Sequence, residues 1–203
     1  MLLKIAKYFS VIFLLSSCGN HNKELKKYGW FKLNKNDSLN VLLQISDFDN
    51  YGKLLYRLKD ITCHDSIPII VLETKKKIRH IYPIEYCEVP MFDPKTRNTF
   101  YIDEDSIYKN ERQVQSVNLT SLLKENYENM GTKADFADSP DKVLFIFEIS
   151  KNKGMNGIQK HLELITKSYD SLETKNDLKI LFWRKIDIVP EFENGELRFK
   201  NVE

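Results

Sequence analysis

The sequence has almost no net charge, and this lack excludes one large class of partners. It contains 31 basic and 29 acidic residues, and removal of residues 1–17 would leave equal numbers of each sign. A protein that binds nucleic acid needs a clear basic excess to neutralise phosphates, so we expect no nucleic acid partner. One local basic run, Lys75 to Lys77 with Arg79, is typical of a solvated loop or strand edge, or of a contact with an anionic surface.

Catalytic and metal-binding signatures are missing too. There is no G-x-S-x-G elbow, no phosphate-binding loop and no H-E-x-x-H motif. Neither Cys63 nor Cys87 has a second thiolate or a histidine at zinc-ligand spacing. We therefore expect no enzyme activity, no cofactor and no metal site. In an oxidising compartment these two cysteines either pair or stay free, because sequence spacing does not fix disulfide geometry.

The N-terminal segment has no hydrophobic run long enough to span a membrane. Its apolar stretch, Tyr8 to Leu15, is about half of the roughly 20 residues that a spanning helix needs. Lysines precede this stretch, and two serines and Cys18 follow it, as in a secretory signal peptide. The ending LSSC resembles the lipobox of bacterial lipoproteins, which implies that Cys18 carries lipid and becomes the new N-terminus. The alternatives are a signal peptide cut elsewhere and a short membrane anchor.

Two β-α-β units follow along the chain, and they indicate an α/β (α+β) fold with helices packed on a mixed sheet. In the first, a strand from Leu39 to Ile45 precedes apolar residues at helical spacing from Tyr51 to Ile61 and the buried strand IPIIVLE. In the second, KVLFIFEI precedes a helix with one apolar face from Ile158 to Leu172 and the strand LKILFW. The likeness indicates either an internal duplication or the convergence of two common units.

The remaining segments give hairpins, a helix and a tether. A strand starts near Tyr28 and leads into a turn at residues 34–37, and FENGELRF predicts a C-terminal hairpin through its Asn-Gly pair. Apolar residues from Leu119 to Met130 indicate another amphipathic helix. The predicted organisation is a signal peptide (1–17), a tether (18–27), a first β-α-β unit (28–90) and a second domain with the C-terminal hairpin (91–203).

The stretch from Thr99 to Trp183 resembles the periplasmic domain of the ExbD/TolR family of envelope motor proteins. FYIDEDSIYKNERQV matches the hairpin of that domain, LTSLLKENYENM its first helix, and DKVLFIFEIS through LKILFW its β-α-β unit. Family members also carry a membrane-spanning helix with a proton-carrying aspartate, whereas this chain has no acidic residue before Cys18. Asp105 or Ser106 stands where the family often has a hairpin glycine. The resemblance therefore implies an envelope-side binding role without proton chemistry.

Three sets of residues are candidates for chemistry. The run from Asp103 to Asp105 is interpreted as a solvated hairpin tip, since adjacent strand residues point to opposite faces. Asp47 and Asp49 are interpreted as the N-cap of the following helix, or as a cation site at a strand end. His64 is expected at a helix end, where its charge complements the dipole. His80 and His161 look isolated, with His161 on the polar side of its helix.

We conclude from the sequence that this is a lipid-anchored protein of the bacterial cell envelope. Its expected function is that of a non-catalytic interaction module whose partners are the membrane, through the N-terminal lipid, and an envelope protein or the cell wall. The candidate docking surface is the final hairpin together with the helix from Ile158 to Leu172. The alternative is a small periplasmic hydrolase or ligand-binding lipoprotein that uses Asp47, Asp49 and His64.

Overall fold

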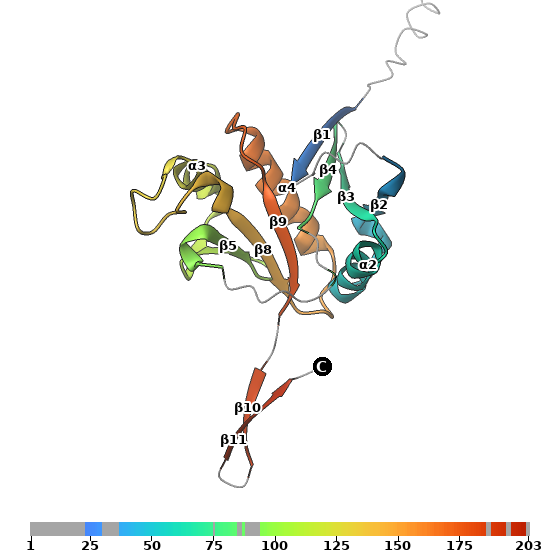
Figure 1. Ribbon diagram of the computed structural model, residues 1–203, viewed down its shortest axis with the longest axis vertical. Helices are drawn as coiled ribbons and strands as arrows, with labels where there is room; N and C mark the ends of the chain where they lie inside the picture. The colour runs from blue at the N-terminus through green and yellow to red at the C-terminus, as the bar shows by residue number, and fades with distance from the viewer. Residues whose placement is uncertain are drawn as a thin grey trace, which may run out of the picture.

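The computed structural model describes residues 23–29, 37–74, 76–84, 87, 94–185, 188–193 and 196–201. Cys18, the predicted signal peptide and most of the predicted tether lie outside these residues. The described part has an α+β fold with three α-helices, a four-stranded and a five-stranded mixed sheet, and a separate two-stranded hairpin (Figure 1). The fold class predicted from the sequence is confirmed.

The four-stranded sheet contains the first predicted β-α-β unit. Its order is β1-β4-β3-β2, formed by β1 (Glu24–Gly29), β2 (Asn40–Gln44), β3 (Ile67–Glu73) and β4 (Lys77–Tyr82). β2 and β3 are parallel neighbours, joined by helix α2 (Tyr51–Cys63). This confirms the β-α-β prediction for residues 39–73.

Strand β1 begins earlier than the sequence indicated. It starts at Glu24, inside the segment predicted to be a tether, and pairs in parallel with β4. The tether prediction is therefore wrong for residues 24–27. These residues show no apolar alternation, and their strand is made by pairing with β4 and by polar contacts to helix α4. The turn predicted at residues 34–37 falls largely outside the described residues.

The five-stranded sheet contains the second unit and has the order β7-β6-β5-β8-β9. Its strands and helices are β5 (Thr99–Ile102), β6 (Ile107–Lys109), β7 (Arg112–Val114), α3 (Leu119–Glu128), β8 (Leu144–Ile149), α4 (Asn156–Asp170) and β9 (Lys179–Arg184). β5 and β6 form the predicted antiparallel hairpin, and β8 and β9 are parallel neighbours on either side of α4 in the chain. The element order predicted for residues 99–183 is confirmed.

Both sheets contribute to one hydrophobic core. Tyr51 of α2 is fully buried in the same cluster as Phe147 and Phe182 of the five-stranded sheet. Its hydroxyl donates to the Phe147 carbonyl oxygen at 2.8 Å, and its ring centre lies 6.4 Å from that of Phe182. The boundary predicted at residues 90–91 therefore separates two β-α-β units of the chain, but it does not separate two cores.

Helix α4 is packed on several sides. It runs behind the strands of the five-stranded sheet in Figure 1, and its Asp170 pairs with Lys26 of β1 and Arg79 of β4 in the other sheet. Only Asn156, Lys160 and Lys167 of this helix are exposed. The candidate docking face on residues 158–172 is therefore unsuited to a partner, because the protein's own sheets already bury it.

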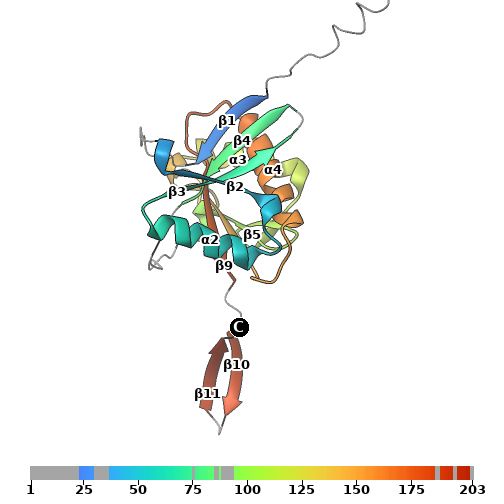
Figure 2. The ribbon, with the colours of Figure 1, turned by 90° about the vertical axis from the view of Figure 1, so that its right-hand side faces the viewer.

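The C-terminal hairpin stands apart from this body. Strands β10 (Ile188–Glu193) and β11 (Glu196–Asn201) pair with each other in antiparallel register, with Glu193 opposite Glu196. Figures 1 and 2 both show the hairpin beyond the end of β9, at the opposite end of the molecule from the start of β1. The predicted hairpin is confirmed, and its Asn-Gly pair lies outside the described residues.

Candidate functional site

The structure does not bring Asp47, Asp49 and His64 together. The two aspartates precede α2 and His64 follows it, so the 13-residue helix separates them by about 20 Å. Asp49 is exposed and pairs with Lys53, whose hydrogen bond lowers the pKa of this carboxyl group. The residue that caps α2 is Asn50, whose side chain accepts from the Lys53 N–H at 3.0 Å. The cap prediction was therefore displaced by one residue.

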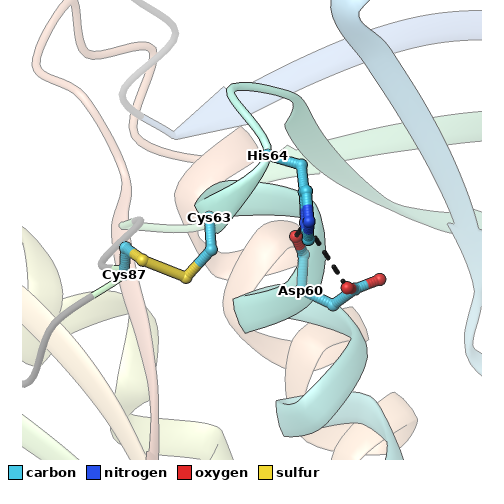
Figure 3. Close-up of a disulfide and its surroundings, with 4 residues drawn as sticks. All are labelled: Asp60, Cys63, His64 and Cys87. Carbon is cyan, nitrogen blue, oxygen red and sulfur yellow. Dashed lines mark hydrogen bonds and ion pairs between the residues drawn. A yellow bond between two sulfur atoms is a disulfide. The ribbon is translucent and has the colours of Figure 1, made fainter.

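His64 and Cys63 have structural partners at the other end of α2. His64 is the C-cap residue, and its Nδ1 lies 2.7 Å from the Asp60 carbonyl oxygen and 3.5 Å from the Asp60 carboxylate (Figure 3). The predicted helix-end position is confirmed. Cys63 forms a disulfide with Cys87, with 4.9 Å between the Cα atoms. This bond joins α2 to the segment after β4, and closing a loop of this size stabilises a fold by roughly 3 kcal/mol.

The acidic run from Asp103 to Asp105 forms the turn of the β5–β6 hairpin, but it is not simply solvated. Asp103 and Ser106 exchange two backbone hydrogen bonds across the turn, at 3.0 and 3.4 Å. Glu104 is half-buried and forms an ion pair with Lys153 at 2.5 Å, while Asp103 lies 3.5 Å from Lys185. Only Asp105 is exposed. The predicted hairpin is thus confirmed, and the predicted solvated tip is only partly so, because Asp103 and Glu104 also form ion pairs.

A small cleft lies where this turn meets the start of α4. It encloses about 190 Å³ and is lined by Glu104, Asp105, Ile149, Lys153, Gly154, Gly157 and Ile158. A Cβ atom at Gly157 would lie 2.9 Å from the Glu104 carbonyl oxygen, so the turn approaches the helix as closely as glycine allows. The sequence signal was the glycine pair of GMNG at a helix start. Among the described residues, no group of three or more His, Cys, Asp or Glu side chains could bind a metal ion.

His161 is buried beside this turn, so its predicted place on the polar side of the helix is wrong. Only 6% of it is exposed, and its Nδ1 has no hydrogen-bond partner within the described part of the chain. Burial lowers the pKa of His161, and the charge of Lys160 lowers it further, against smaller opposing effects of Asp105 and the Glu104 backbone. The imidazole is therefore held in its neutral form.

Lys109 is a second buried titratable group that sequence reasoning missed. It is 5% exposed, its Nζ donates to the Arg97 carbonyl oxygen, and it lies 4.9 Å from the centre of the Phe100 ring. It has no carboxylate partner in the described ranges. Burial lowers the pKa of Lys109 to about 8. The available signal was alternation, since Ile107 and Lys109 lie on the same face of β6 and Ile107 is buried.

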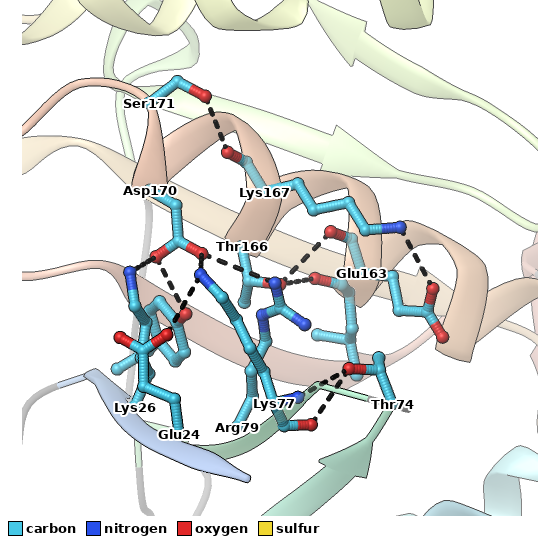
Figure 4. A network of polar contacts seen from close by, with 12 residues as sticks. Glu24, Lys26, Thr74, Lys77, Arg79, Glu163, Thr166, Lys167, Asp170 and Ser171 are labelled. Atoms are coloured by element: carbon cyan, nitrogen blue, oxygen red, sulfur yellow. Dashed lines mark hydrogen bonds and ion pairs between the residues drawn. The ribbon is translucent and has the colours of Figure 1, made fainter. Parts of the chain in front are cut away.

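The largest ion-pair cluster among the described residues surrounds Asp170 at the end of α4 (Figure 4). Its carboxylate accepts from Lys26 at 3.0 Å, from the Tyr28 hydroxyl at 2.9 Å and from Arg79 at 3.4 Å. Lys77 lies 3.7 Å away. Burial would raise the pKa of Asp170, but the hydrogen bonds and nearby cations outweigh it and lower the pKa. The cluster attaches β1 and β4 to α4.

The comparisons with known proteins identify no relative. No family model, curated protein or solved structure matches this chain. No helix of the described part is long and apolar enough to cross a membrane.

Proposed function

We propose that the protein is a lipid-anchored component of the bacterial cell envelope and acts as a non-catalytic interaction module, similar to the periplasmic domain of the ExbD/TolR family. Lipid on Cys18 would hold it at the membrane, and the folded body would bind an envelope protein or the cell wall. The alternative of a hydrolase or ligand-binding protein depended on Asp47, Asp49 and His64, which lie at opposite ends of α2.

One observation carries the proposal: the C-terminal hairpin stands away from the body and divides its residues by face. Strand alternation and the register place one set of positions together. That set is Ile188, Pro190, Phe192, Leu197, Phe199 and the polar Asn201. The other face carries Val189, Glu191, Glu193, Glu196, Arg198 and Lys200. The residue types in this register therefore follow an amphipathic pattern.

An amphipathic hairpin of this kind favours a protein partner. An isolated two-stranded hairpin is marginally stable in water and gains stability when a third strand or an apolar surface covers it. A partner segment that adds a strand would supply main-chain hydrogen bonds, and the apolar positions would supply side-chain pockets. We assign the docking role to β10 and β11, since α4 is already covered.

The experiment is crosslinking of the full chain in bacterial membranes, followed by purification and identification of the linked protein. The test variant is Phe192→Ser with Phe199→Ser on the apolar face, and the matched control is Glu191→Gln with Arg198→Gln on the charged face. We expect the same crosslinked product from the wild type and the control, and its loss from the test variant. Equal recovery of the crosslinked product from both variants would refute the docking role of the apolar face.

The lipid anchor has its own test. Cys18→Ala should move the protein out of the membrane fraction, because acyl chains contribute about 0.8 kcal/mol per buried CH₂ to membrane binding. Unchanged membrane retention would refute lipidation and leave the hairpin result standing on its own.

A further inference from the structure

A basic surface surrounds the start of the described chain. We call it the basic pole and define it as Lys23, Lys26, Lys27, Lys76, Lys77 and Arg79. Two contacts bring its parts together: the Glu24 N–H donates to the Lys76 carbonyl oxygen at 3.1 Å, and Lys23 pairs with Glu73. The pole therefore consists of the first strand, the turn between β3 and β4, and the first residues of β4.

The pole is strongly charged in a chain that is otherwise balanced. Glu24, Glu73 and Asp170 are the carboxylates paired with its cations, which leaves an excess of three positive charges. Residues 18–203 carry equal numbers of acidic and basic residues, so the rest of that chain has an excess of three negative charges. The pole therefore differs in sign of charge from the rest of the chain.

Several of these cations are available to a partner. Lys23, Lys27 and Lys76 are exposed, and Lys27 and Lys76 make no ion pair with any described residue. Leu25, which lies among them on β1, is 50% exposed. By contrast, Lys26, Lys77 and Arg79 are held by Asp170 (Figure 4), which fixes the strand β1 that carries Lys27 and the start of β4 next to Lys76.

The distance along the chain places the pole beside the membrane. Lys23 follows Cys18 by five residues, which span at most about 17 Å when fully extended. If Cys18 is lipidated, as the proposed function holds, the start of β1 lies close to the headgroups. Attraction between lysines and an anionic membrane acts within a Debye length of roughly 10 Å, so the pole is within range.

We propose that the basic pole binds anionic phospholipid headgroups and seats the body on the membrane in one orientation. This inference rests on the proposed anchor at Cys18. The hairpin β10–β11 lies at the opposite end of the molecule, so a body seated on its basic pole points the hairpin away from the bilayer (Figure 1). The pole and the hairpin then have separate partners.

The test is sedimentation of the full chain with phosphatidylcholine vesicles, with and without phosphatidylglycerol. The test variant is Lys27→Glu with Lys76→Glu, and the control is Lys59→Glu with Lys151→Glu, which alters exposed lysines on α2 and in the loop before α4. Residues 1–17 are the same in every variant, so the gain in binding on adding the anionic lipid reports the folded body. Equal unfolding midpoints confirm that each variant is folded.

We expect phosphatidylglycerol to strengthen binding of the wild type and the control alike. Each lysine near an anionic surface contributes about fivefold in binding, so the test variant should lose at least about twenty-five-fold of that gain. Raised salt should remove the same gain from the wild type. An equal loss in the control, no loss in the test variant, or equally tight binding to duplex DNA would overturn the assignment.

Failure of this proposal is distinguishable from failure of the proposed function. The same vesicle comparison in a Cys18→Ala background reports the pole without lipid on Cys18. Two outcomes separate the proposals. If phosphatidylglycerol still strengthens vesicle binding, but Cys18→Ala stays in the membrane fraction in cells, only the lipid anchor is refuted. If phosphatidylglycerol does not strengthen binding, but Cys18→Ala leaves the membrane fraction, only the basic pole is refuted.

Discussion

Replacement of Lys109 should stabilise the protein at neutral pH. The pKa of Lys109 falls from 10.5 to about 8 because the side chain is buried. A tenfold change in a proton-binding constant corresponds to about 1.4 kcal/mol, so charging this buried group costs up to about 3 kcal/mol. Lys109→Met keeps the length and the apolar stem and removes the charge. We expect the variant to be about 1–3 kcal/mol more stable at pH 7, after loss of the contacts to Phe100 and the Arg97 carbonyl.

The pH dependence gives the sharper assay. Between pH 8 and 10.5 the unfolded chain keeps its proton on Lys109 and the folded protein does not, so the stability of the wild type rises with pH in this window. Below the folded pKa, both states bind the proton and the cost of charging is fully present. The variant lacks this contribution, so the difference in stability between the two proteins should shrink as the pH rises towards 10.5.

The measurement is urea unfolding of both proteins at pH 7, 8, 9 and 10.5. Tyrosines and other lysines titrate in both proteins, so subtracting one curve from the other isolates Lys109. A difference that stays constant from pH 7 to 10.5 would refute the depressed pKa. A variant less stable at every pH would show that the cation–ring contact and the hydrogen bond outweigh the cost of burial.

Two further predictions test the contact between the acidic turn and α4. Gly157→Ala should destabilise the protein by about 1–3 kcal/mol, because its Cβ would lie 2.9 Å from the Glu104 carbonyl oxygen. The control is Gly154→Ala, whose Cβ would have no atom within 4 Å. Equal unfolding free energies of the two variants would contradict the close approach. His161 has a lowered pKa in the folded state, so the stability it supports is present above its unfolded pKa of about 6.5 and is lost as the pH falls below that value. His161→Gln should flatten this acid limb in thermal unfolding, and an unchanged limb would refute the effect of burial on His161.

The β-α-β units were predictable because their signals are local. IPIIVLE and LFIFEI are continuous apolar runs that a sheet buries on both faces, and the helix of each unit, α2 before the first run and α4 after the second, has apolar residues at helical spacing. The hairpin at residues 99–109 followed from its turn. In each of these segments, the secondary-structure propensity of the residues, their hydrophobic pattern and their burial in the folded protein favour the same helix or strand.

The errors occurred where tertiary packing decides the environment. Three of residues 24–27 are charged and the segment shows no apolar alternation, and it forms a strand because β4 offers an edge and Asp170 holds Lys26. His161 was predicted to be exposed because it lies off the apolar face of its helix, and a helix packed on a single sheet buries only that face. Helix α4 is packed on several sides, so residues off the apolar face are buried as well. A one-residue error at the start of α2 is typical of caps, since Asp47, Asp49 and Asn50 are all good N-cap residues.

The positions of the two proposed surfaces support each other on physical grounds. A body attached only through a short tether could lie on its side against the membrane, and a docking hairpin would then often face lipid. Headgroup binding at the basic pole removes that freedom and raises the fraction of molecules whose hairpin is accessible. The apparent affinity of the protein for its hairpin partner rises in proportion to that fraction. Lys27→Glu with Lys76→Glu should therefore reduce crosslinking through the hairpin in membranes, although it alters no hairpin residue. The same variant should crosslink normally to the identified partner in detergent solution, where no membrane orients the body, and a loss in both settings would contradict this coupling.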